Sequence, residues 1–129
     1  MSYAVVMLGG GIGSVLRFAL SNFIASRYGD SFPLGTLIVN ISGCFAIGLV
    51  AALSDPDGRL FLSSTTRQFL MIGVMGGYTT FSSFSLQTLN LARDGEWVPA
   101  GMNILLSVVL CLIGVWLGNT LAQLLNNWR

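Results

Sequence analysis

Uncharged stretches separated by short polar segments account for most of the chain. A membrane-spanning helix needs about 20 mostly apolar residues, and four stretches have this character, at residues 4–25, 34–53, 68–92 and 97–124. All five acidic residues and five of the six arginines lie between these stretches or at the ends, and Arg17 is the exception. The pattern predicts an all-α membrane protein with four transmembrane helices, in which residues 1–129 form a single membrane domain.

Composition supports this prediction and excludes several classes of function. Only 9% of the residues are charged, whereas a soluble domain carries about 25%. A net charge of +1 without any lysine provides no basic stripe, which excludes nucleic acid as a partner. The chain has no histidine, and the predicted spans contain no acid, so enzymatic acid–base chemistry and proton-coupled transport lack their usual groups. We therefore expect a passive pathway or a structural role.

Small residues in the predicted helices indicate close packing. Gly9 and Gly13 in the first stretch, and Gly114 and Gly118 in the last, are spaced by four residues. Glycines at this spacing let membrane helices approach closely. The two cysteines lie inside apolar runs and are interpreted as small hydrophobic residues, not as a disulfide framework or a zinc site.

The arginines are distributed almost evenly between the two ends of the predicted bundle. The side with both termini holds Arg59, Arg67 and Arg129, and the other side holds Arg27 and Arg93. Orientation in a membrane normally follows an excess of positive charge on one side. So small an excess predicts that the chain inserts both ways and pairs as an antiparallel dual-topology homodimer. A fixed topology set by other features is the alternative.

The middle of the third stretch is unfavourable for a continuous helix. Two glycines, Gly76 and Gly77, are followed after Tyr78 by Thr79 and Thr80, and all four lower helix propensity. We predict a helix break at these residues. Unwound backbone within a membrane must be buried or line a wet cavity. Its carbonyls suit Na⁺ or a similar cation, and its N–H groups attract anions; a kink that serves packing alone is the alternative.

Uncharged polar residues also occur inside two other predicted helices, the second and the last. Asn40 lies midway through the second stretch, where its amide either bonds a neighbouring helix or faces a pore. Asn103, Ser107 and Cys111 are spaced by four residues on one stripe of the last stretch, which favours a hydrated lane over isolated helix contacts.

Aromatic and hydroxyl residues alternate after the predicted break. Phe81 and Phe84 are three residues apart and share a helix face, while Ser82 and Ser85 share the neighbouring face. The edge of a phenylalanine ring carries partial positive charge. Ring edges beside hydroxyl donors are suited to a small anion that must lose its water.

Together these residues resemble the Fluc family of fluoride channels, also called CrcB proteins, over essentially the whole chain. The most specific motif is Gly-Gly-Tyr-Thr-Thr-Phe-Ser-Ser-Phe-Ser, at 76–85. Gly35-Thr36-Leu37 followed by Asn40 and Gly43, and Arg17 in the first stretch, are supporting features.

The resemblance implies a fluoride-selective passive channel that exports fluoride across the bacterial inner membrane. It implies an antiparallel homodimer in the lipid bilayer, with two fluoride pathways. It further implies a structural Na⁺ at the dimer centre, held by the backbone carbonyls of Gly76 and Thr79 from both subunits. Arg17 matches an arginine of the first helix, with a structural or vestibule role.

The implied fluoride pathway combines amide, hydroxyl, thiol and aromatic side chains. By the resemblance its members are Asn40, Phe81, Phe84, Ser82, Ser83, Asn103, Ser107 and Cys111. Three positions depart from the family pattern: Tyr78 replaces the expected leucine, Ser83 a threonine, and Cys111 a serine. A thiol is a weaker donor than a hydroxyl, so Cys111 is expected to contribute little to the polar track.

Two other functions compete with the channel. A small multidrug exporter also has four short helices, but its mechanism needs a glutamate embedded in the first helix, and here that stretch has Arg17 and no acid. A non-conducting membrane packing protein would explain the glycines, but it leaves Asn40 and the polar stripe without a role.

Overall fold

The computed structural model describes residues 2–128, which are helical apart from short connections. Two helices come first, followed by a segmented third span and a long last helix. The elements are α1 (Ser2–Tyr28), α2 (Leu34–Leu53), α3 (Ser64–Arg67), the π-helix η1 (Gln68–Met75), α4 (Gly76–Tyr78), α5 (Phe81–Arg93) and α6 (Trp97–Asn127).

Within residues 2–128, four helical segments are long and apolar enough to cross a membrane. They are Tyr3–Tyr28, Leu34–Leu53, Ser64–Arg93 and Trp97–Asn127. The predicted four-helix organisation is therefore confirmed by length and composition. The second span has the predicted bounds, and the others extend a few residues beyond them.

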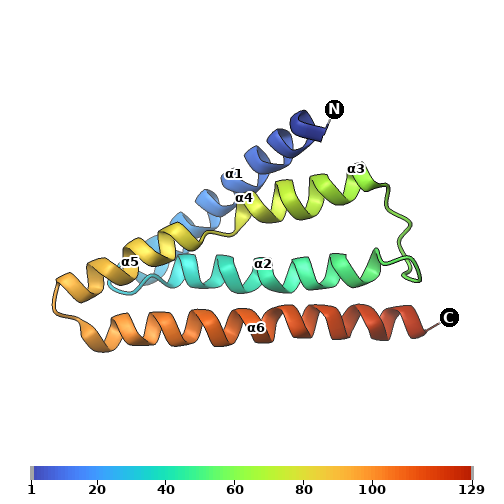
Figure 1. The fold of residues 1–129 in the computed structure, drawn as a ribbon. Helices are drawn as coiled ribbons and strands as arrows, with labels where there is room; N and C mark the ends of the chain where they lie inside the picture. Colours follow the sequence, from blue (N-terminus) through green and yellow to red (C-terminus); the bar gives the residue numbers. More distant parts are fainter. Residues whose placement is uncertain (1, 129) are drawn as a thin grey trace.

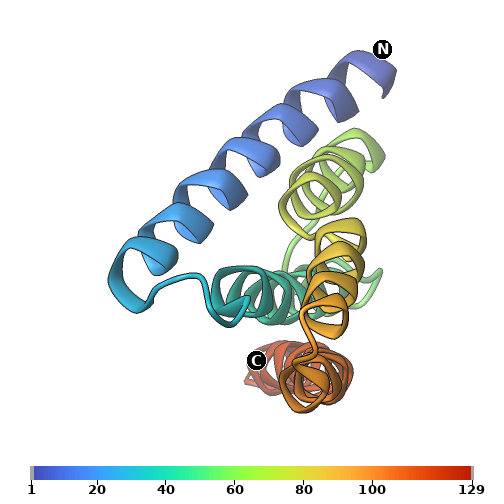
Figure 2. The same ribbon diagram turned by 90° about the vertical axis from the view of Figure 1, so that its left-hand side faces the viewer.

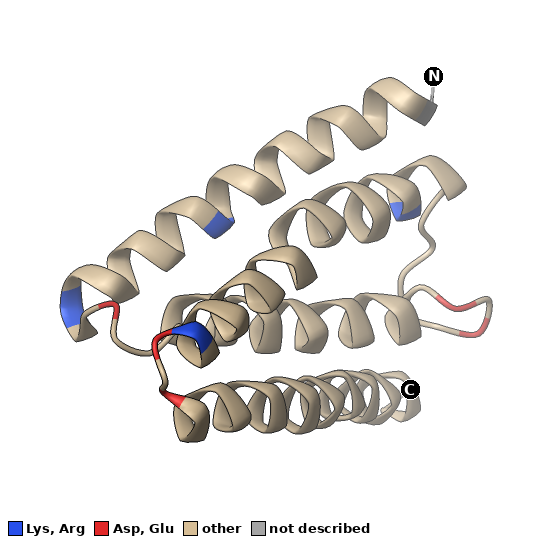
Figure 3. Cartoon of the chain, turned by 60° about the vertical axis from the view of Figure 1, so that its left-hand side comes forward, with Lys and Arg blue, Asp and Glu red and all other residues tan. Residues whose placement is uncertain are grey.

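The four spans alternate in direction (Figure 1). α1 and the third span run one way, and α2 and α6 run the other way side by side (Figures 1 and 2). Charged residues gather mainly in the connections at the two ends (Figure 3). Arg59 and Arg67 belong to one end and Arg27 and Arg93 to the other, while Arg129 lies outside the described residues.

Backbone-to-backbone contact at glycines holds two pairs of elements together. A Cβ on Gly9 would lie 3.0 Å from the Cα of Gly73 in η1, and one on Gly13 would overlap a backbone carbonyl of the same element. In α6, a Cβ on Gly114 would lie 3.0 Å from a carbonyl oxygen of α2, and one on Gly118 would overlap another. The predicted packing role of both glycine pairs is confirmed.

Candidate ion pathway at the break in the third span

The third span is interrupted at two threonines. Thr79 has φ −80° and ψ 157°, Thr80 has φ −151° and ψ 115°, and α5 begins at the next residue. Gly76 and Gly77 are helical and form the start of α4. Their predicted place in the break is therefore wrong, and the extended backbone belongs to the β-branched residues, which favour it.

Gly77 has a packing role that explains why it stays helical. A Cβ at this position would lie 2.9 Å from the Cα of Gly10 in α1 and would overlap the Gly10 carbonyl oxygen. The Ser14 hydroxyl of α1 also donates to the Gly77 carbonyl, at 3.4 Å. The neighbouring Gly76 is exposed, and no heavy atom lies closer than 4.0 Å to the position of its Cβ. Contact with α1 thus outweighs the low helix propensity of glycine.

The side chain of Asn40 holds the break from α2. The Thr80 N–H donates to Asn40 Oδ1 at 2.8 Å, and Asn40 Nδ2 donates to the Thr80 carbonyl at 3.0 Å. One amide therefore satisfies both backbone groups of the residue that leaves the helix. An amide nitrogen carries two N–H donors, and the bond to Thr80 uses one of them. Asn40 therefore forms an interhelical bond, and it also lines the cavity beside the break.

The carbonyls of Gly76 and Thr79 are among those that lose their ordinary helical donors at this joint. In a continuous α-helix the Gly76 carbonyl would accept from the N–H of Thr80, and the Thr79 carbonyl from that of Ser83. The Thr80 N–H instead donates to Asn40, and the Ser83 N–H donates to Thr80 Oγ1 at 3.2 Å. The carbonyls of Gly76 and Thr79, which the resemblance assigned to Na⁺, are thus released by two identifiable bonds. Carbonyl oxygens are hard ligands, which suit this cation.

The hydroxyl groups of Ser82 and Ser83 cluster around Thr80. Thr80 Oγ1 donates to Ser83 Oγ at 3.0 Å and lies 3.3 Å from Ser82 Oγ. Because Thr80 also accepts the Ser83 N–H, it is the N-cap of α5. The two predicted pathway serines therefore take part in starting the second half of the span.

A cavity of about 450 Å³ lies beside the joint, between α2, the third span and α6, and we call it the central cavity. Most of the residues predicted for the site line it. These are Asn40, Gly76, Thr79, Thr80, Phe81, Phe84, Ser107 and Cys111. The lining does not include Ser82, Ser83, Asn103, Gly77 or Arg17.

Phe81 and Phe84 form a tilted pair on the wall of the central cavity. Their ring centroids are 5.2 Å apart and the ring planes meet at 53°. Phe84 is 9% exposed, whereas Phe81 is 77% exposed. The more exposed ring is therefore free to present its edge to an anion or to a neighbouring chain.

Asn103 lies outside this arrangement. It is 2% exposed and donates to Thr88 Oγ1 at 2.8 Å. The Thr88 hydroxyl in turn donates to the Phe84 carbonyl at 2.8 Å. The structure thus separates Asn103, which joins α5 to α6, from Ser107 and Cys111, which line the central cavity. Arg17 is half-buried in the middle of α1.

Sequence reasoning missed two contacts that support the site. The Tyr78 and Ser42 hydroxyls lie 2.8 Å apart, which ties the last residue of α4 to α2. The Met75 carbonyl accepts from both the N–H and the hydroxyl of Thr79, each at 3.0 Å. The departure of Tyr78 from the family pattern was the available signal for the first contact. Nothing in the sequence pointed to the second.

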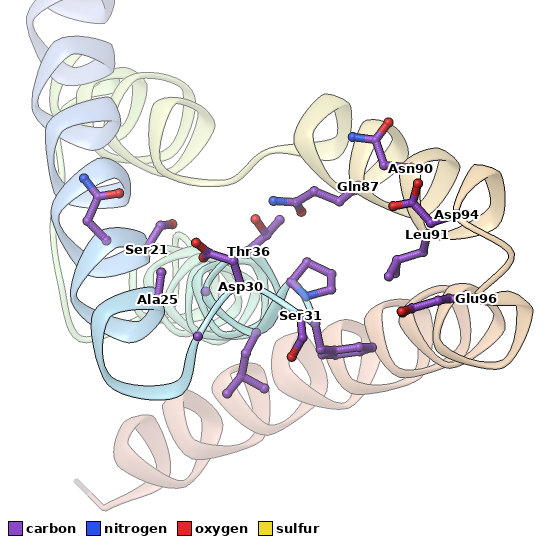
Figure 4. Close-up of a pocket in the computed structure, with 16 residues that line it drawn as sticks. Ser21, Ala25, Asp30, Ser31, Thr36, Gln87, Asn90, Leu91, Asp94 and Glu96 are labelled. Carbon is purple, nitrogen blue, oxygen red and sulfur yellow. The ribbon is translucent and has the colours of Figure 1, made fainter.

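A separate cavity of about 480 Å³ opens at the end of the molecule that holds the two shorter connections (Figure 4). We call it the end cavity. Polar side chains from α1, α2 and α5 line it, together with the carboxylates of Asp30, Asp94 and Glu96. Three carboxylates provide no attraction for an anion. The groups that stabilise an anion must therefore lie outside the end cavity.

Comparison with known proteins places the chain in a family. Residues 4–119 match the family model described as CrcB-like protein, Camphor Resistance (CrcB). Relatives named fluoride-specific ion channel FluC include one from Opitutus terrae, 57% identical over 98% of this chain and 96% of its own length. Those from Rhodospirillum rubrum and Paramagnetospirillum magneticum are 58% and 52% identical, each over 98% of both chains.

The family match and the four apolar helices of the described residues agree on an integral membrane protein. The chain belongs to the CrcB-like family.

Proposed function

We propose that this chain is a fluoride-specific passive ion channel. The observation that carries the proposal is its identity of 57% and 58%, over 98% of its length, with two relatives of that name. The chemistry of the central cavity supports it. The lining offers amide, hydroxyl and aromatic groups and no ionisable carboxylate, imidazole or amine, which favours passive movement over proton-coupled transport.

Fluoride is small and strongly hydrated, so it needs replacement donors when it loses water. The unused N–H of Asn40, the Ser107 hydroxyl and the edges of the two phenylalanines provide neutral donors in the central cavity. Conduction requires binding that is weak enough for release, and neutral donors meet this condition better than a fixed positive charge. An inside-negative potential then drives fluoride out of the cytoplasm, across the bacterial inner membrane.

A second copy of the chain completes the pathway. The released carbonyls of Gly76 and Thr79 border a cavity that is open on a single chain, and such groups are not stable against lipid. An antiparallel copy would cover them and give two pathways per dimer. The nearly even division of Arg27 and Arg93 against Arg59, Arg67 and Arg129 supports insertion in both orientations.

The carbonyls of Gly76 and Thr79 from the two copies would hold a structural Na⁺. Bound there, the cation supplies a fixed positive charge that offsets the charge of fluoride at a distance. Asn40 and Thr80 keep these carbonyls available, because they engage the N–H groups that would otherwise pair with them.

Fluoride efflux from liposomes tests the proposed function. Purified protein is reconstituted into vesicles loaded with fluoride, and efflux is recorded with a fluoride electrode. Chloride-loaded vesicles and protein-free vesicles serve as controls. We expect rapid loss of fluoride and negligible loss of chloride. Absence of fluoride efflux from a folded dimer would contradict the proposal and favour a packing protein or an exporter.

Dependence on Na⁺ is tested separately. The protein is purified and reconstituted with Na⁺ replaced by a large organic cation that cannot fit between carbonyls. We expect a lower dimer melting temperature and slower fluoride efflux, both restored by Na⁺. Identical melting and efflux in the two media would contradict the cation site and leave the channel function standing.

Orientation is tested with an accessible thiol in the connection between α2 and α3. A single cysteine is introduced there in a cysteine-free background, and reconstituted vesicles are treated with a membrane-impermeant maleimide. Dual topology predicts labelling of about half the chains from outside and the remainder after permeabilisation. In proteoliposomes a fixed-topology protein can also scramble during reconstitution, so the same assay is run on cells. Labelling of all chains or none in cells would contradict dual topology.

A further inference from the structure

The two cysteines of the chain face the same cavity. Cys44 belongs to α2 and Cys111 to α6, and both line the central cavity, half-buried. The two helices that carry them pack against each other along much of their length. Each was interpreted from the sequence as a small hydrophobic residue because it lies inside an apolar run, and 67 positions separate the two in the chain. The fold makes them a pair.

The two helices hold this pair in place by backbone contact on both sides. One turn from Cys111, a Cβ on Gly114 would lie 3.0 Å from the Ile41 carbonyl oxygen. One turn from Cys44, a Cβ on Gly48 would lie 3.1 Å from the Val115 carbonyl carbon. Helices in such contact cannot separate the thiols without repacking, so the pair is preorganised for a shared ligand.

The surroundings of the pair select the kind of ligand. The described part of the chain contains no group of three or more His, Cys, Asp or Glu side chains that could hold a metal. Zinc in structural sites takes four protein ligands, so two thiols do not suit it. Calcium and magnesium require several oxygen ligands. Two thiolates alone suit a soft d¹⁰ cation that is stable with two ligands in a line.

We propose that Cys44 and Cys111 form a two-thiolate binding site for a soft d¹⁰ metal cation, for which Hg²⁺ is the probe. Each thiol releases one proton, and the cation forms one bond to each sulfur, so one Hg²⁺ replaces two protons and the complex is neutral. No oxidant or reductant takes part. A metal held there lies on the wall of the central cavity, one helical turn from Asn40 on α2 and one turn from Ser107 on α6. Its expected effect on fluoride movement rests on the proposed function, whereas binding does not.

Mass spectrometry of the purified protein tests the site directly. After treatment with one equivalent of Hg²⁺, we expect a monomer that carries one mercury and has lost two protons. The doubly substituted Cys44→Ser, Cys111→Ser variant has no cysteine and should carry none. A second ligand on the same scaffold raises the affinity for the metal by roughly 100-fold or more. A competing thiol should therefore remove Hg²⁺ from each single variant at a concentration roughly 100-fold lower than it needs for the wild type.

Several outcomes would overturn the two-thiolate site. They are two mercury atoms per chain, one mercury joining two chains, no adduct on the folded protein, or equal retention by the wild type and the single variants. If the cysteine-free variant fails to fold, wild-type protein whose thiols are alkylated after folding provides a second thiol-free form.

Fluoride efflux gives the second readout. Each variant is compared with its own rate before Hg²⁺ is added, because both cysteines line the cavity. We expect Hg²⁺ to remove most of the wild-type efflux and none of the cysteine-free efflux. Equal inhibition of both would overturn the proposed consequence of binding. Absence of wild-type efflux before Hg²⁺ is added would instead contradict the channel function, while the mass measurement would still decide the metal site.

Discussion

The two halves of the third span pack against different neighbours by different chemistry. Before the joint, η1 and α4 contact α1 through glycine backbones, as at Gly13 and Gly77. After the joint, α5 contacts α6 through side chains, with the Asn103 amide bonded to Thr88. In a continuous helix, the positions that face α1 and those that face α6 would follow a single helical periodicity. The break therefore lets a single span combine close backbone packing with a polar side-chain contact.

The joint between the halves carries the chemistry that neither half has. Asn40 satisfies both backbone groups of Thr80, which releases the Gly76 carbonyl, and the Thr80 hydroxyl accepts the Ser83 N–H, which releases the Thr79 carbonyl. A substitution before the joint should therefore act on packing, and one at the α5–α6 contact on a local hydrogen bond. A substitution in the joint, or in the cavity wall where Phe81 begins α5, should act on ion movement.

The largest effect is expected for Asn40→Asp. The ionised carboxylate still accepts the Thr80 N–H but cannot donate to the Thr80 carbonyl, and it places negative charge in the path of an anion. An unsatisfied buried polar group costs about 1–3 kcal/mol, so fluoride efflux should fall by about tenfold or more. Efflux is measured in liposomes at matched dimer content. Near-wild-type efflux from a folded dimer would remove Asn40 from the pathway.

Phe81→Ile is expected to have the second-largest effect on conduction. Isoleucine keeps the apolar volume but lacks a polar ring edge. Because aromatic edge interactions are worth roughly 0.5–1.5 kcal/mol, efflux should fall by about threefold to tenfold while the dimer elutes unchanged from a sizing column. Phe18→Ile is the matched control, since Phe18 is 70% exposed on α1 and does not line the central cavity. Equal rates for the two variants would contradict the ring-edge role.

Gly13→Ala tests the half before the joint. Its Cβ would overlap the Val74 carbonyl oxygen and lie 2.7 Å from the Tyr78 nitrogen. Overpacking of this kind costs about 1–3 kcal/mol, so the melting temperature in detergent should fall. Gly11→Ala is the control in the same helix, because no heavy atom lies within 4 Å of its Cβ position. A melting temperature lowered equally by both would show that contact with the third span is not the cause.

Hydropathy alone was sufficient to locate the four spans, because charge is confined to the connections and to Arg17. Helix propensity located the break correctly at Thr79 and Thr80, but it was wrong to extend the unwinding to Gly76 and Gly77. Propensity describes an isolated helix, whereas contact with α1 keeps Gly77 helical. The position of the joint depends on a bond from Asn40, which lies 40 residues from Thr80 in the chain.

Helical periodicity correctly predicted which polar residues share a face of α6, but it could not show which side chains surround them. It placed Asn103, Ser107 and Cys111 on one stripe of α6, but the packing of α5 covers the first, and only the other two line the central cavity. Periodicity cannot show where a neighbouring helix begins to cover a stripe. The partnership of Cys44 with Cys111 was hidden for the same reason.

Asn103→Leu tests the half after the joint. The change removes the donor to Thr88, whose own hydroxyl keeps its bond to the Phe84 carbonyl. A hydrogen bond of this kind contributes about 0.5–1.5 kcal/mol, so the melting temperature should fall less than for Gly13→Ala. A double-mutant cycle with Thr88→Val isolates the pair. Additive effects in that cycle, or a loss of efflux as large as that of Asn40→Asp, would contradict the assignment of Asn103 to packing.

The smallest effect is expected for Tyr78→Phe, which removes one hydroxyl beside the joint. The Tyr78 hydroxyl lies 2.8 Å from that of Ser42, which keeps its own bond to the Val39 carbonyl at 3.0 Å. Because Ser42 stays satisfied, the free energy of unfolding should fall by about 0.5 kcal/mol, the lower end of the range for a hydrogen bond. Ser42→Ala should lower the melting temperature by a similar amount, and the double variant by no more than either alone. A large loss of efflux from Tyr78→Phe with unchanged melting would instead show that the hydroxyl acts on the ion, and that the joint extends one residue further into α4.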